Sequence, residues 1–140
     1  MKTTLFILLV TLLAACDKPV VGYLNTGDAA YLPDTLVIPR RADLDPVADA
    51  TRLDNNAPWV SLRVQGVLGT PPLYYSVASA RETGGGSVDA FLREVAMIGG
   101  GIFYFPLHHE TPPGRYLVSV RVRNEGHDKI IPDAFTFIVK

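Results

Sequence analysis

Apolar and polar residues alternate along most of the chain after residue 58, and this period of two predicts short β-strands. The clearest run is 116–123, where Tyr116, Val118, Val120 and Val122 alternate with other side chains. The same alternation or a short apolar run predicts further strands at 31–38, 60–65, 73–78, 102–105 and 135–139. Glycine- and proline-rich turn signals separate the strands at 69–72, 83–87, 99–101, 111–114 and 124–126.

The number and spacing of these strands predict an all-β fold, a single antiparallel β-sandwich of about seven strands over residues 29–140. We expect the final strand, 135–139, to pair with 116–123. The expected core consists of the inward positions of these two strands: Tyr116, Val118, Val120, Val122, Phe135 and Phe137.

The segment 87–97 fits two structures. Ser87 could cap a helix that places Phe91, Leu92 and Val95 on one face. The segment could also be a further strand. Because each of its neighbours reads as a strand, we expect a strand here.

The first residues have the order of a secretory signal peptide. A basic Lys2 precedes the run 5–13, which is apolar apart from Thr11, and the small residues Ala14 and Ala15 follow it. The run is too short to span a bilayer, which takes about 20 apolar residues. We therefore expect residues 1–15 to be removed on export.

The single cysteine, Cys16, follows directly, and Leu13-Ala14-Ala15-Cys16 resembles the lipobox of bacterial lipoproteins. The resemblance implies cleavage between Ala15 and Cys16 and attachment of membrane lipid to Cys16. It also implies that the protein sits in the cell envelope, in the outer membrane. Residues 16–28, with polar side chains, Pro19, Gly22 and Gly27, are expected to form a tether between lipid and domain.

Charge and cysteine content bear on the partners of the protein and on what stabilises its fold. Removal of residues 1–15 takes away Lys2, so 13 Lys+Arg become 12 against 14 Asp+Glu. This near-balance gives no reason to expect nucleic acid as a partner, because such proteins carry a basic face. A lipidated Cys16 leaves no disulfide, so the fold depends on its apolar core.

The C-terminal third is similar to immunoglobulin-like and cadherin-like domains. Gly114-Arg115-Tyr116, followed by the valines of 118–122, resembles a tyrosine corner. With the lipobox and tether, the stretches "YLPDTLVI", "GTPPLYYSV", "GGGIFYFP" and "PPGRYLVSVRVRNEG" resemble small Bacteroidota lipoproteins with one immunoglobulin-like domain. Several of these accompany glycan-uptake systems. The resemblance implies a fold and a location rather than an activity.

No motif in the sequence predicts catalysis, a cofactor or a metal site. His108-His109-Glu110 has no third ligand at a fitting spacing, and the glycine runs lack the flanking elements of a phosphate loop. The segment 52–58 resembles a cadherin calcium linker but has Arg52 where a carboxylate belongs and only Asp54 charged negatively. We expect no enzyme, and no ion requirement.

Binding is the remaining function. Trp59 and Arg63 share the strand face opposite Val60, Leu62 and Val64, and Tyr74 points away from Leu73 and Tyr75. We expect Trp59, Arg63 and Tyr74 to offer a surface to a glycan or a protein; alternatively, Trp59 packs beneath the connection 40–57. The protein is then a binding or accessory module of an outer-membrane glycan-uptake system, or a structural subunit docking on a larger outer-membrane complex. Exposed coplanar aromatic rings would favour the first, and a flat apolar patch of several hundred Å² the second.

Overall fold

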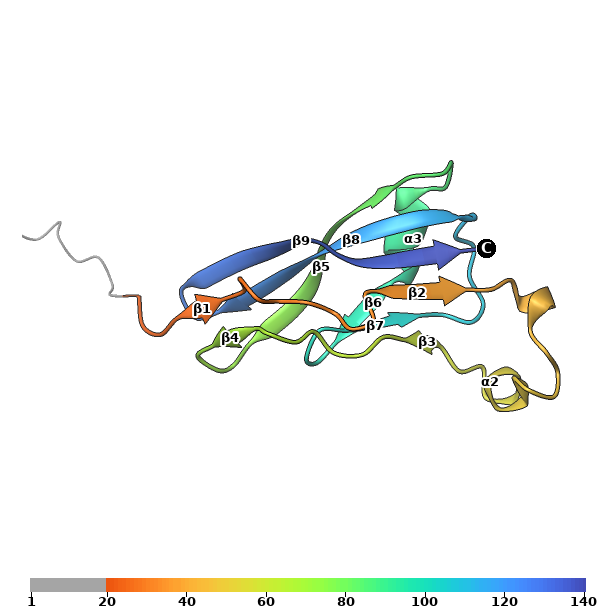
Figure 1. Ribbon diagram of the computed structural model, residues 1–140, viewed down its shortest axis with the longest axis horizontal. Coiled ribbons are helices and arrows are strands. Elements are labelled where there is room, and N and C mark those ends of the chain that lie inside the picture. The colour runs from red at the N-terminus through yellow and green to blue at the C-terminus, as the bar shows by residue number, and fades with distance from the viewer. Residues whose placement is uncertain (1–19) are drawn as a thin grey trace, which may run out of the picture.

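The strands of the protein form two facing sheets and a small ribbon (Figure 1). The computed structural model describes residues 20–140, so the expectations for the signal peptide 1–15, for cleavage after Ala15 and for Cys16 concern residues outside the described part. The larger sheet has the order β2-β9-β8-β5, the smaller β3-β7-β6, and β1 pairs with β4. The all-β sandwich is thereby confirmed.

The helices and strands have the following bounds, in chain order. They are β1 Leu24–Asn25, β2 Thr35–Ile38, the 3₁₀-helix η1 Arg41–Asp43, α2 Ala50–Asp54, β3 Trp59–Val60, β4 Leu68–Gly69, β5 Tyr74–Glu82, α3 Val88–Glu94, β6 Ala96–Ile98, β7 Ile102–Phe105, β8 Gly114–Asn124 and β9 His127–Val139.

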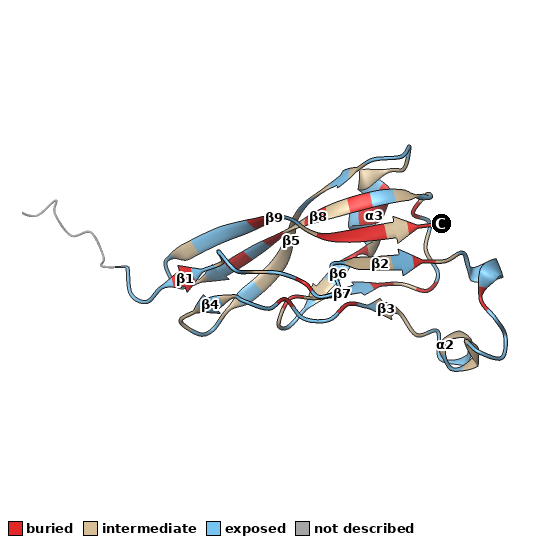
Figure 2. Cartoon of the chain, viewed as in Figure 1, coloured by how far each residue is buried: buried red, intermediate tan, exposed pale blue. Residues whose placement is uncertain are grey.

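The hairpin of β8 and β9 is the centre of the larger sheet, and the predicted pairing of 135–139 with 116–123 is confirmed. Tyr116 lies opposite Phe137, and Val118 lies opposite Phe135. All six predicted core residues of these strands are buried (Figure 2). Across the sandwich, the rings of Phe103 and Phe105 in β7 lie 5.4 and 5.7 Å from that of Phe137. The inner faces of the two sheets therefore share one aromatic core.

One strand pair departs from the predicted antiparallel arrangement. β2 runs parallel to β9, with Thr35 opposite Thr136 and Ile38 opposite Val139. The two strands lie near opposite ends of the chain, so no hairpin turn forces them to run antiparallel. A parallel pair requires a long connection between its strands, and the intervening chain provides one. Ile38 and Val139 are both buried, which anchors the ends of these strands to the core.

The prediction of a strand over 87–97 was wrong for its first half. Residues 88–94 form α3, and the Ser87 hydroxyl accepts a hydrogen bond from the Ala90 N–H at 3.3 Å, as an N-cap does. The helix buries Phe91, whose ring stacks on that of Tyr116 with centroids 4.5 Å apart. This packing stabilises the helix, and within the segment only 96–98 forms a strand.

Tyr116 also makes the hydrogen bond that a tyrosine corner requires. Its hydroxyl donates to the Pro112 carbonyl at 2.7 Å and accepts from the Ser87 N–H at 3.1 Å. The residue therefore joins β8, the preceding loop and the start of α3. That the sandwich is immunoglobulin-like in its detailed topology stays a prediction.

The domain begins earlier than the predicted boundary at residue 29. Leu24 and Asn25 pair with Gly69 and Leu68, which makes part of the expected tether a strand of the fold. Tyr23 is fixed as well, because the Thr70 N–H donates to its carbonyl at 3.0 Å. The polar composition of this segment suggested a tether, but its backbone hydrogen bonds make it part of the fold. The fold therefore reaches at least to Tyr23.

Candidate functional site

The three residues predicted to bind a ligand do not come together. Trp59 lies in β3 of the smaller sheet, opposite Phe105. Tyr74 begins β5 of the larger sheet, opposite Arg123. Arg63 follows β3 and lies against the turn at Gly100. They lie on two different sheets and a connecting segment, so no single sheet face presents all three to a sugar ring.

Trp59 packs beneath the connection 40–57, as the alternative interpretation has it. The guanidinium carbon of Arg52, in α2, lies 3.9 Å from the centre of its ring, and the indole also packs against the core. Phe103 and Phe105 are fully buried, and Tyr74 is exposed. Trp59, Tyr74, Phe103 and Phe105 therefore form no row of exposed aromatic rings that would favour a glycan platform.

The expected inward face at 60–64 is also corrected. Val60 and Leu62 are exposed, while Ser61 between them is buried and Val64 is buried further on. The Ser61 hydroxyl accepts from the Phe103 N–H at 2.9 Å, which satisfies this polar group inside the sandwich. The predicted faces are thus reversed at 60–62, whereas Val64 is buried as predicted.

The segment that resembles a calcium linker has a different chemistry here. Arg52 donates to the carbonyls of Ala57 and Pro58, at 3.3 and 2.7 Å, so a guanidinium fills the centre of this turn. Among residues 20–140, no three His, Cys, Asp or Glu side chains gather to hold a metal ion. Independence from metal ions stays a prediction.

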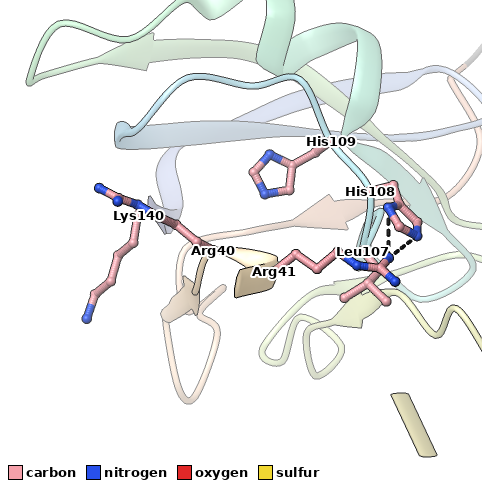
Figure 3. A pocket seen from close by; sticks show the side chains of 6 residues that line it. All are labelled: Arg40, Arg41, Leu107, His108, His109 and Lys140. Carbon is pink, nitrogen blue, oxygen red and sulfur yellow. Dashed lines mark hydrogen bonds between the residues drawn. The ribbon is translucent and has the colours of Figure 1, made fainter. Parts of the chain in front are cut away.

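A hollow of about 290 Å³ collects basic side chains at one end of the sandwich (Figure 3). Its lining consists of Arg40, Arg41, Leu107, His108, His109 and Lys140. We call it the basic hollow. It contains three permanent cations and two histidines, and no carboxylate side chain is part of the lining.

The parallel pair β2–β9 explains why these cations meet. Parallel strands end at the same edge of a sheet, so the residues that follow Ile38 and Val139 leave side by side. Arg40 and Arg41 follow the first strand, and Lys140, whose N–H donates to the Ile38 carbonyl at 3.0 Å, follows the second. The loop after β7 adds Leu107, buried, and the two histidines.

The two histidines point in different directions (Figure 3). Arg41 Nη1 lies 2.9 Å from His108 Nδ1 and is also in contact with its Nε2. Because a guanidinium only donates and a neutral imidazole has one acceptor nitrogen, only one of these two contacts can be a hydrogen bond. His108 thereby holds one face of the Arg41 guanidinium in place.

His109 offers an unused polar atom at the hollow. Its ring lies 5.2 Å from that of Phe105, and its Nδ1 is buried without a hydrogen-bond partner among the described residues. Leaving such an atom unpaired costs about 1–3 kcal/mol. A ligand that reached this nitrogen would recover part of that cost.

The loop that carries the histidines is held by Glu94, the last residue of α3. Its carboxylate accepts hydrogen bonds from the N–H groups of Glu110 and Thr111, at 2.6 and 3.0 Å, and from the Thr111 hydroxyl. Burial opposes ionisation, but the hydrogen bonds and the nearby His109 outweigh it and lower the pKa of Glu94. The ionised carboxylate is therefore a structural support of the hollow.

Sequence reasoning missed this site because its cations lie a hundred residues apart. Two signals were present in the sequence: Arg40-Arg41 just after an apolar strand, where side chains emerge at a sheet end, and the pair His108-His109. Only the parallel pairing with the last strand brings Lys140 beside them.

Within residues 20–140, none of the helices has the length and apolar character needed to cross a membrane. A comparison with family models, with curated proteins and with solved structures found no match to this chain.

Proposed function

We propose that this chain is a non-catalytic binding module, anchored in the cell envelope by lipid on Cys16, and that it binds an anionic glycan in the basic hollow. The observation that carries the proposal is that Arg40, Arg41 and Lys140 line one hollow to which no Asp or Glu side chain contributes. No lining residue is a serine, threonine, cysteine or acid that could serve beside a histidine as nucleophile or base. This favours binding over catalysis.

The size of the hollow and its hydrogen-bond donors limit the kinds of ligand that fit. At about 290 Å³ it is close to the lower end of small-molecule pockets, so it suits one sugar-sized unit. Guanidinium groups bind carboxylates and sulfates with two parallel hydrogen bonds, which makes an acidic sugar the preferred unit. The resemblance to lipoproteins that accompany glycan-uptake systems supports the same choice.

The position of the hollow also fits an anchored protein. The start of the described chain, before β1, and the C-terminal end of β9 lie toward opposite ends of the long axis (Figure 1). Lys140, which follows β9, lines the basic hollow. A chain attached to lipid through Cys16 would therefore present the hollow away from the bilayer, where a polymer in solution can reach it.

A second candidate function is docking on a larger outer-membrane protein, and a separate surface favours it. On the outer face of the smaller sheet, Tyr104 lies between Val60 on one side and Ala96 on the other. All three are exposed, as are Leu62 and Ile98 further along. Such a flat apolar face is what a docking subunit requires. Tyr104→Glu should abolish cross-linking of the protein to an envelope partner while leaving glycan binding intact.

Titration calorimetry of the full chain with an oligogalacturonate tests the main proposal. The double variant Arg40→Gln/Arg41→Gln should bind at least about tenfold more weakly, because each hydrogen bond to a charged group contributes about 1.5–3 kcal/mol. Arg93→Gln, an exposed arginine of α3 away from the hollow, is the matched control and should bind as the wild type does.

A neutral galactan of equal length should not bind, and added salt should weaken the acidic ligand. Equal affinity for the neutral and acidic oligosaccharides would contradict the proposal, and so would equal losses in the double variant and the control.

A further inference from the structure

We infer that the end of the fold opposite the basic hollow rests directly on the lipid bilayer. This surface, which we call the proximal end, is formed by β1, β4, the start of β5 and the turn between β8 and β9 (Figure 1). The inference rests on the lipid anchor of the proposed function and adds the orientation of the domain relative to the bilayer.

The length of chain before the fold leaves little room between domain and membrane. Four residue steps separate Cys16 from Val20, and a fully extended chain spans at most about 14 Å over that distance. Val20 already lies against the β8–β9 turn, because a side-chain carbon added at Gly126 would lie 2.8 Å from its Cγ1. Lipid on Cys16 therefore keeps the proximal end within reach of the headgroups.

The proximal end is a connected surface. The Asn124 side-chain amide donates to the carbonyls of Tyr23 and Thr70, at 2.8 and 3.1 Å, which joins the start of the fold to the end of β8. Tyr74 lies beside it, opposite Arg123, and the two line a hollow of about 340 Å³ together with Asn124. Leu68 pairs with Asn25 on the neighbouring ribbon.

Several large apolar and aromatic side chains of the proximal end are exposed to solvent. Five of them are each more than half exposed: Val20, Val21, Tyr23, Leu68 and Tyr74. Tyrosine is favoured at membrane–water interfaces, because its ring enters the apolar boundary while its hydroxyl stays hydrated. Arg123, which lines the hollow beside Tyr74, offers a guanidinium to a lipid phosphate.

Charge contributes little to this contact. Arg123 and Lys129 are exposed near the turn, but so are Glu125 and Asp128, and Asp128 forms an ion pair with Arg121. With Arg121 counted, three cations stand against two carboxylates, so the net charge near the turn is only +1 and attracts anionic lipid weakly. Apolar contact with the interface should therefore dominate and should not depend on salt.

Tryptophan fluorescence of the lipidated full chain in phosphatidylcholine vesicles tests the inference, with a nitroxide on the headgroup of a fraction of the lipid. The wild type reports from Trp59, which packs under α2 in the smaller sheet. The double variant Trp59→Phe/Tyr74→Trp moves the single reporter to the proximal end. Trp59→Phe/Tyr23→Trp provides a second reporter position in case the first variant folds poorly.

We expect the nitroxide lipid to quench emission from the reporters at 74 and 23 and to leave Trp59 unquenched, at low and high salt alike. Mass spectrometry and co-sedimentation with the vesicles report separately on the anchor. Lipidated, co-sedimenting protein without quenching at 74 and 23 would overturn the docked orientation alone. A chain without lipid on Cys16 would overturn the anchor and, with it, this inference.

Discussion

Replacement of Glu94 by glutamine should weaken both the domain and the loop that forms one wall of the basic hollow. The carboxylate accepts three hydrogen bonds from two consecutive residues, Glu110 and Thr111. Glutamine keeps one acceptor oxygen but turns an amide N–H₂ towards the other donors. At least one backbone N–H of the loop then loses its partner.

The size of the effect follows from these contacts. Hydrogen bonds to a charged group contribute about 1.5–3 kcal/mol, and the neutral substitute retains about 0.5–1.5 kcal/mol. Because Glu94 is only half-buried, we expect Glu94→Gln to lower the free energy of unfolding by about 1–2 kcal/mol. Glu110→Gln, at an exposed side chain next in the same network, should change it by less than about 0.5 kcal/mol.

The loss should also depend on pH in a defined direction. The folded pKa of Glu94 lies below its unfolded value, so the stability it contributes is present above the unfolded pKa and is lost as pH falls through the folded pKa. Urea denaturation of the wild type and both variants at pH 7 and at pH 3 measures this. The gap between wild type and Glu94→Gln should be largest at pH 7 and should shrink in acid. Equal stabilities at pH 7, or a gap that widens in acid, would refute the reasoning.

Three further predictions concern the fold and the anchor. Val120→Asp should prevent folding, seen as loss of the near-ultraviolet circular dichroism, because Val120 is fully buried and an unpaired carboxylate there costs several kcal/mol; a folded variant would contradict the core assignment. Tyr116→Phe should cost about 1–3 kcal/mol, since it unpairs the Pro112 carbonyl and the Ser87 N–H, whereas Tyr104→Phe, at an exposed ring, should cost almost nothing in the same denaturation assay. Cys16→Ser should release the protein from membranes or leave an uncleaved precursor in cell fractions, and a mutant processed and retained as the wild type is would exclude the lipid anchor.

The parts of the fold that the sequence predicted are those with a strict local pattern. The alternation at 116–123 and 135–139 predicted six buried residues of β8 and β9, although Thr136, on the expected outward face, is buried as well. The tyrosine corner was equally local, because Tyr116 bonds to a carbonyl only four residues earlier.

The parts that were mistaken depend on contacts distant in the sequence. Residues 88–94 form a helix because Phe91 stacks on the ring of Tyr116, a contact distant in the sequence. The N-cap at Ser87 was a local signal for this helix. Val60 and Leu62 face outward because the buried Ser61 bonds to Phe103 in another strand. The basic hollow depends on the parallel pairing of β2 with β9, which no local pattern indicates.

The central claim, that an acidic glycan binds in the basic hollow, is tested most directly by locating the ligand. Backbone amide NMR spectra of the full chain, recorded during titration with an oligogalacturonate, would map the contacted residues. The account predicts shifts confined to the residues around 38–41, 107–109 and 140. Shifts centred on the outer face of β3, β7 and β6, or saturating binding that leaves 38–41 and 140 unchanged, would contradict it.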